Sequence, residues 1–345
     1  KLRQRTLLTW LRQQRRLAKP WLSITVLLGG FSAGLLIGQA WLLASLLHGF
    51  ILDGMPKREQ GMAFVMLLGI VLLRSLLAMA REQSAFTGAT RVRRQIRRQL
   101  QEEMARRGPA YLQRQPAGSW ASLLQEQVEN LHDFYARYLP QTQLSGLQPF
   151  LILLAVFPVN WTAGLILLGT APLIPLFMIL TGIGAADANR RNFEALRRLS
   201  GHFLDRLRGM ATLRLYRRAD AERDSIARAS EDFRERTMEV LRMAFLSSAV
   251  LEFFASVSIA ILAVYFGFSY LEHLSFGDYG TKVTLFVGLF VLLLAPDFYM
   301  PLRELGAHYH AKAQALGAAD AIEQFLNEPV TAIQSGSGQL AADEP

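Results

Sequence analysis

The sequence contains no cysteine among its 345 residues. Disulfide bonds, thiolate metal sites, a cysteine nucleophile and a thiolate haem ligand are therefore excluded within this chain. Charge is also scarce, because 19% of the residues are Asp, Glu, Lys or Arg while 51% are hydrophobic. An ordinary soluble domain carries about 25% charged residues, so a water-soluble enzyme is disfavoured.

Two long segments lack Asp, Glu, Lys and Arg altogether. These are the 48 residues from Leu139 to Ala186 and the 32 residues from Trp21 to Leu52. A helix crosses a bilayer in about 20 apolar residues, so the pattern predicts an all-α polytopic membrane protein. The segment from Trp21 is about twice as long as the apolar part of a secretory signal, and we expect it to be retained.

Six membrane spans are predicted from the distribution of apolar residues. The longer uncharged segment is divided at Pro158–Trp161, where Pro and Asn favour a turn and Trp suits the membrane interface. The expected spans are Trp21–Leu52, Gly61–Ala80, Pro140–Phe157, Trp161–Thr181, Met243–Tyr270 and Val283–Leu302.

The distribution of basic residues predicts the orientation of these spans. Residues 1–19, 81–138 and 187–242 hold 7, 10 and 14 basic residues, whereas residues 53–60 and 271–282 together hold 3. Basic segments stay in the cytoplasm, so both termini and both long segments are expected on the cytoplasmic side of a bacterial inner membrane. The net charge of +9 follows from this asymmetry and calls for no nucleic-acid partner.

The two long basic segments are helical in composition and are expected to form hairpins that extend from the membrane. At about 1.5 Å per residue, Arg81–Arg107 would project roughly 40 Å before Gly108 and Pro109 end the helix. In the second hairpin, Gly209 offers a break and a return helix is expected from about Ala219. The two tips are expected near residues 109–116 and 207–216.

The two ends of the chain differ from the six-helix domain predicted for residues 21–327. Residues 1–20 place leucines and Trp10 among arginines, which predicts a helix lying at the membrane interface; a solvated basic tail is the alternative. Residues 328–345 are rich in Gly, Ser and Ala and are expected to be a linker.

Among the six histidines, no two have the i, i+4 spacing of a zinc site on a helix. The segment His308-Tyr309-His310 is the candidate for haem, because iron accepts His or Tyr as axial ligands and Arg303 and Lys312 could meet the propionates. An ordinary polar contact between helices is the alternative.

Charged residues within membrane spans are costly and usually face a cavity or a partner. Arg74, Glu252 and Asp297 meet this description, and Arg81 lies at the inner boundary of the second span. Arg74 or Arg81 could bind a carboxylate or propionate of a substrate. Alternatively, these side chains form structural ion pairs or extend to the interface.

Six spans, two cytoplasmic termini and two deep hairpins match the membrane domain of a type IV ABC exporter. Several long strings also closely resemble the CydD family, whose members form one half of the heterodimeric CydDC transporters required to assemble cytochrome bd oxidase. They are Gly169–Phe177, Gly184–Asn192, Gly201–Gly209 and Tyr309–Ala315.

The resemblance implies a CydC-like partner, membrane lipid as surroundings, and coupling helices that contact nucleotide-binding domains. Pro109, Tyr111 and Leu112 of the first tip and Gly209 and Leu213 of the second match the coupling positions. The sequence has no G-x-x-x-x-G-K-[ST] motif, so this chain alone is not expected to hydrolyse ATP. ATP and Mg would be held by domains absent from this chain.

The resemblance also implies haem binding and transport, with Tyr309 and His310 at the axial position and His310 as the iron ligand. Export of cysteine or glutathione to the periplasm is the alternative substrate hypothesis. A haem-binding membrane scaffold that transports nothing is a further alternative. A passive channel does not account for the long hairpins, and an intramembrane enzyme lacks a clustered nucleophile, metal site or carboxylate pair.

Overall fold

The computed structural model describes residues 2–328 except 53–60, 114, 217, 275, 278 and 280–282. No strand occurs in this part of the chain, which confirms the all-α prediction. In chain order the elements are α1 (Leu2–Ile51), α2 (Gly61–Leu112), α3 (Ala117–Ser122), the π-helical turns η1 (Leu123–Gln127) and η2 (Phe134–Tyr138), α4 (Leu139–Val156), α5 (Trp161–Thr170), α6 (Leu173–Arg208), α7 (Met210–Leu215), α8 (Ala219–Tyr270), α9 (Leu285–Ala307) and α10 (Tyr309–Asn327).

The chain folds as two compact units. Unit 1 comprises Lys1–Leu28, Ala78–Gln143 and His308–Pro345, and unit 2 comprises Gly29–Leu77 and Leu144–Ala307. Helices α1, α2 and α4 contribute residues to both units. Each unit has its own hydrophobic core.

The core of unit 1 is built around α2. Val92, Ile96, Leu100 and Met104 recur every four residues and form one buried stripe along this helix. They pack with leucines of α1, with residues 123–136, and with the alanine-rich face of α10. Small alanine side chains let a helix approach its neighbour closely, so α10 is held tightly in this unit.

The N-terminal segment is part of unit 1. It does not form a separate helix, because α1 runs without interruption from Leu2 through Pro20 to Ile51. Leu7 and Leu11 are buried in the unit 1 core, and Arg3 forms an ion pair with Asp320 of α10 at 2.6 Å. The segment is therefore not a solvated tail; its position at the membrane interface stays a prediction.

The core of unit 2 joins residues of α1, α4, α5, α6, α8 and α9. On α9 the buried residues include Phe290, Leu294 and Phe298, which repeat every four residues and present one apolar face to the other helices. The membrane part of α2 is different, because the most apolar window of this helix has no buried residue in the structure. That surface is consistent with contact to lipid or to another subunit.

Five of the described helical segments are long and apolar enough to cross a membrane: Ala18–Ile51, Gly61–Leu112, Trp161–Met178, Asp220–Tyr270 and Leu285–Asn327. Helix α4 corresponds to the predicted third span but is not among them, and its first ten residues include Gln141, Gln143 and Gln148. The third span therefore stays a prediction. The expected division between spans three and four is confirmed, since Asn160 caps α5 by accepting a hydrogen bond from the Ala163 backbone N–H at 2.8 Å.

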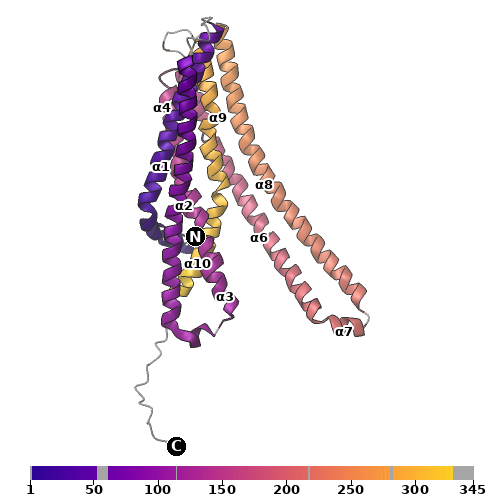
Figure 1. Ribbon diagram of the computed structural model, residues 1–345. Coiled ribbons are helices and arrows are strands. Elements are labelled where there is room, and N and C mark those ends of the chain that lie inside the picture. The colour runs from indigo at the N-terminus through magenta and orange to yellow at the C-terminus, as the bar shows by residue number, and fades with distance from the viewer. Residues whose placement is uncertain are drawn as a thin grey trace, which may run out of the picture. The chain divides into compact units, whose positions relative to one another are not determined.

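Helices α6 and α8 lie side by side and form the second predicted hairpin, with the short helix α7 at its tip (Figure 1). Gly209 separates α6 from α7, and α8 begins at Ala219, as the sequence predicts. The helix of the sixth span is interrupted before the chain ends: α9 ends at Ala307 and α10 starts at Tyr309, with His308 as its N-cap residue.

Candidate functional site

The first hairpin tip is formed by a glycine-dependent break in α2. Gly108 has φ 77° and ψ 171°, a conformation that is essentially restricted to glycine. The helix resumes at Pro109 for one short turn and is followed by α3. The break in α2 therefore lies where the sequence predicts it. Pro109 is exposed, while Tyr111 and Leu112 are half-buried against the core of unit 1.

Arg107 lies directly before this break and is buried, with a side chain only 1% exposed. Its guanidinium lies 4.9 Å from the ring centroid of Tyr111 and 4.3 Å from that of Phe325 on α10. Cations over aromatic faces are attracted by the ring quadrupole. The arginine thus lies between the first tip and the end of α10.

Hydrogen bonds fix the Arg107 guanidinium in this place. Its Nη2 donates to the Phe325 carbonyl at 2.5 Å and to the Glu328 carbonyl at 3.1 Å, while Nε donates to Glu103 Oε1 at 2.9 Å. The Tyr111 hydroxyl accepts from Nη1 at 2.9 Å and donates to the Glu328 carboxylate. We call these five residues, Glu103, Arg107, Tyr111, Phe325 and Glu328, the arginine clamp.

Two pKa shifts reflect the electrostatics of the arginine clamp. The hydrogen bond that Arg106 donates is the largest effect on Glu103 and lowers its pKa. Burial acts in the opposite direction, but together with the hydrogen bond from Arg107 the net effect holds the pKa of Glu103 below its usual value. Burial and the bond to Glu328 raise the pKa of Tyr111. The glutamate is therefore an anion and the tyrosine a neutral hydroxyl at physiological pH, which are the forms that the clamp requires.

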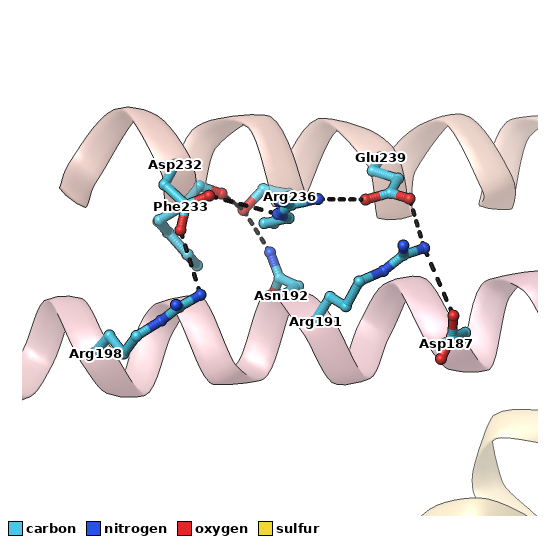
Figure 2. A network of polar contacts seen from close by, with 9 residues as sticks. Asp187, Arg191, Asn192, Arg198, Asp232, Phe233, Arg236 and Glu239 are labelled. Atoms are coloured by element: carbon cyan, nitrogen blue, oxygen red, sulfur yellow. Dashed lines mark hydrogen bonds and ion pairs between the residues drawn. The ribbon is translucent and has the colours of Figure 1, made fainter. Parts of the chain in front are cut away.

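The second hairpin is held by polar contacts between its two helices (Figure 2). Arg191 of α6 binds Glu239 of α8 at 2.7 Å and also approaches Asp187 at 3.7 Å. Asn192 Nδ2 donates to Thr237 Oγ1 at 2.8 Å. Exposed pairs of this kind contribute little stability each, so they mainly fix the register of the two helices. We call the set the polar ladder: Asp187, Arg191, Asn192, Arg198, Asp232, Arg236, Thr237 and Glu239.

The tip of the second hairpin presents apolar side chains to its surroundings. Leu207, Met210, Leu215 and Tyr216 are all exposed, while Gly209 and Leu213 are half-buried. Exposed apolar side chains gathered at one end of a long rigid hairpin are typical of a contact surface for another protein. The predicted coupling residues therefore lie at both tips, although what they contact stays a prediction.

The charged residues predicted within the spans have different surroundings. Glu252 forms an ion pair with Arg303, which favours the structural interpretation for that residue. Arg74 on α2 donates a hydrogen bond to the side chain of Gln39 on α1. The Asp297 backbone carbonyl on α9 accepts a hydrogen bond from the Gln148 side chain on α4 at 3.2 Å.

The residues proposed for haem lie in unit 1 around the start of α10. Tyr309 is 46% exposed, His310 is exposed and His308 is half-buried. The Lys312 ammonium lies 5.4 Å from the Tyr309 ring centroid and 6.0 Å from that of Tyr138. Arg81 is half-buried and forms no hydrogen bond or ion pair within the described residues. The donor set fits haem in type, since two possible axial ligands lie beside a cation.

Two further polar sites escaped prediction. Thr170, Ser258 and Tyr299 join α5, α8 and α9 through their hydroxyls, with Thr170 Oγ1 at 2.9 Å from Ser258 Oγ and 2.7 Å from the Tyr299 hydroxyl. Isolated hydroxyl residues in apolar spans were the available signal. The second site is the arginine clamp. Nothing in the sequence distinguishes Arg107 from the many other arginines around it.

The family follows from the sequence comparison. A sequence model of the ABC transporter transmembrane region matches residues 22–293, so the chain belongs to this family. Within it, the similarity to CydD extends over the whole chain, and the expected resemblance is confirmed.

Three relatives show the extent of this similarity. The glutathione/L-cysteine transport system ATP-binding/permease protein CydD of Escherichia coli K12 is 54% identical over 100% of this chain and 59% of its own length. The transport ATP-binding protein AarD of Providencia stuartii is 54% identical over 94% of this chain and 55% of its own. The Bacillus subtilis protein named CydC in the same kind of system is 31% identical over 73% of this chain and 43% of its own. The chain thus spans less than two thirds of the length of these relatives.

Proposed function

We propose that this chain is the membrane-spanning part of a half-transporter that exports L-cysteine or glutathione across the bacterial inner membrane. It would pair with a CydC-like subunit, with both termini in the cytoplasm. ATP and Mg would be bound by nucleotide-binding domains, and their closure would drive alternation between inward and outward openings. The names of the CydD relatives support the substrate class.

The observation that carries the proposal is the pair of hairpins with broken tips, in a chain similar to CydD throughout. The tips lie at Gly108 and Gly209, where short turns present side chains beyond the ends of long helices. A rigid hairpin transmits displacement of its tip to the membrane helices that it continues. The polar ladder and the arginine clamp supply the rigidity that such transmission requires.

The experiment is ATP-driven uptake of labelled L-cysteine and glutathione into inside-out vesicles. The vesicles contain the complete heterodimer with its nucleotide-binding domains. We expect uptake that requires ATP and is lost when ATP hydrolysis is blocked. Uptake that persists without hydrolysis, or no uptake of either thiol, would reject export of thiols by this transporter.

Haem is a second candidate ligand, favoured by the exposed pair Tyr309 and His310 beside Lys312. His310 would bind the iron, and Lys312 or Arg81 would meet the propionates. Haem titration of the heterodimer, followed at the Soret band, tests this with Tyr309→Phe and His310→Ala variants. A saturable spectrum unchanged in both variants would remove these residues from the haem site. If the chain were instead a membrane scaffold that transports nothing, it would still support assembly of cytochrome bd oxidase when ATP hydrolysis is blocked.

A further inference from the structure

The first helix carries four basic residues on one side, directly before the first predicted span. Arg12, Arg15, Arg16 and Lys19 follow the spacing i, i+3, i+4 and i+7, which places their side chains on the same face of α1. Arg12, Arg16 and Lys19 are exposed and Arg15 is half-buried. We call these four residues the basic face of α1.

The basic face is not turned towards the core of unit 1. Leu7, Leu11 and Ala18 are buried in that core, and at 3.6 residues per turn they lie about 110° around the helix from the basic face. The Tyr135 hydroxyl also donates a hydrogen bond to the Leu11 carbonyl at 2.8 Å. These contacts fix the rotation of α1 about its axis, so the four basic side chains are held at the surface.

The basic face has no ionic partner in the part of the chain that the structure describes, where no ion pair of 4.0 Å or less involves any of its four residues. The sequence offers no acidic neighbour on the same helix, because the first acidic residue is Asp53. Arg3 differs, since it lies on another face of α1 and pairs with Asp320 of α10 at 2.6 Å. Like charges one helical turn apart repel one another, so a bound anion would relieve an unfavourable interaction on this face.

The basic face also lies close to the expected membrane surface. Lys19, Arg16 and Arg15 precede Trp21, the first residue of the predicted span, by 2, 5 and 6 residues, which correspond to about 3, 8 and 9 Å along a straight helix. The Debye length is about 8 Å at physiological ionic strength, so these charges are within reach of the surface potential of a membrane. Clusters of Lys and Arg immediately beside a span are typical of segments that attract anionic lipids.

We propose that the basic face binds the phosphate groups of anionic phospholipids at the surface of the membrane that the first span crosses. Each arginine can donate two parallel N–H groups to phosphate oxygens, and Lys19 adds a point charge at the end nearest the span. The uncharged segment that follows, Trp21–Leu52, would keep the helix among the acyl chains of the same lipids. Neither thiol export nor haem binding enters this inference.

The test measures lipid binding to the complete heterodimer with its nucleotide-binding domains, purified in a neutral detergent. Phosphatidylglycerol or the zwitterionic phosphatidylcholine is added, and bound lipid is counted by native mass spectrometry. We expect saturable binding of phosphatidylglycerol that exceeds binding of phosphatidylcholine. In a variant that combines Arg12→Gln, Arg15→Gln and Arg16→Gln, the apparent Kd for phosphatidylglycerol should rise roughly 10- to 100-fold, while binding of phosphatidylcholine stays unchanged.

The matched control combines Arg218→Gln, Arg223→Gln and Arg228→Gln. These substitutions also remove three positive charges from exposed arginines, but they lie around the start of α8, 15 or more residues before Met243 and the predicted fifth span. That separation is about 22 Å or more along the helix, well beyond the Debye length, so binding of phosphatidylglycerol should match that of the wild type.

The other outcomes also decide the proposal. Equal losses in the two triple variants would show that net charge rather than this face attracts the lipid, and would overturn it. Equal binding of the two lipids would do the same, as would displacement of phosphatidylglycerol by millimolar inorganic phosphate, which indicates a site for free phosphate.

Two results concern assembly of the heterodimer. Release of the partner subunit from the neutralised variant, with binding of phosphatidylglycerol unchanged, would assign the basic face to an acidic protein surface and overturn the lipid site. If the triple variant fails to assemble, Arg16→Gln alone should still raise the Kd for phosphatidylglycerol roughly 5-fold, and an unchanged Kd would overturn the proposal. Because these measurements use neither ATP nor thiol, they are independent of whether thiol export fails.

Discussion

Burial in unit 1 changes the ionisation of individual polar residues, and His132 is an example. His132 is half-buried, and its ring contacts the ring of Phe86 at a centroid distance of 5.3 Å. Burial, followed by the positive charge of Arg93, lowers its pKa below 6.5, against the smaller opposing effects of Asp133 and Glu129. The folded chain therefore favours neutral histidine more strongly than the unfolded chain does.

This shift predicts a pH dependence of stability. As pH falls through about 6.5, the unfolded chain takes up a proton before the folded chain does, so stability is full above this pH and decreases towards the lowered folded pKa. We expect the thermal midpoint of the detergent-solubilised heterodimer to fall between pH 7.5 and 5.5, and to fall less in His132→Gln. The exposed His202 provides the control, because His202→Gln should leave the wild-type slope unchanged.

The arginine clamp predicts a large effect of a single side chain. Arg107→Ala would leave the buried Phe325 carbonyl without its donor and remove one donor each from Glu103 and the Glu328 carbonyl, and should cost about 3 kcal/mol of stability. Arg107→Lys should recover little, because an ammonium cannot reproduce the forked guanidinium contacts. Chemical denaturation measures both. Arg106→Ala, which removes an exposed neighbour, should cost much less stability than Arg107→Ala; equal losses in both variants would contradict the clamp.

At the scale of elements, the positions of the helix breaks were largely predictable from local sequence. Gly108-Pro109, Gly209 and Asn160 carry their own conformational signals, and the structure places breaks or caps at all three. The break at His308 was not among the predicted breaks, although Gly306 lies two residues before it. The arginine clamp was also unpredictable, because Arg107 and Phe325 are separated by 218 positions and meet only through tertiary packing.

The backbone of the first tip predicts a specific sensitivity to substitution. Gly108→Ala places a side chain at φ 77°, which should destabilise the fold by about 1 to 3 kcal/mol. Gly118→Ala in α3 is the matched control, because a methyl group there meets no atom within 4 Å and should be neutral or slightly stabilising. Thermal unfolding of the two variants measures the difference. A Gly108→Ala variant as stable as wild type would show that the tip tolerates another backbone conformation.

At the scale of the whole molecule, composition and charge distribution predicted the membrane class and the fold, while the position of α4 in the membrane stays a prediction. These patterns do not specify the substrate, because transporters with the same fold carry many different substrates. The contacts of the charged residues in the apolar spans likewise required the structure, because Glu252 meets Arg303 and Arg74 meets Gln39 through packing between helices.

The absence of cysteine makes the predicted orientation directly measurable. Single cysteines introduced by Tyr216→Cys and Glu272→Cys lie at opposite ends of α8. We expect a membrane-impermeant maleimide to label the second in intact spheroplasts and the first only after permeabilisation. The unsubstituted protein controls for background labelling, and the reverse pattern would invert the topology.

The polar ladder has a consequence for the fate of the chain in the cell. Helices α6 and α8 bind one another through charged and amide side chains, and large apolar side chains outside the predicted spans, including Phe193 and Phe203, remain exposed. A newly made chain without a companion therefore displays the kind of surface that chaperones hold and membrane proteases degrade. The amount of this subunit that accumulates should consequently follow the synthesis of whatever protein covers those helices.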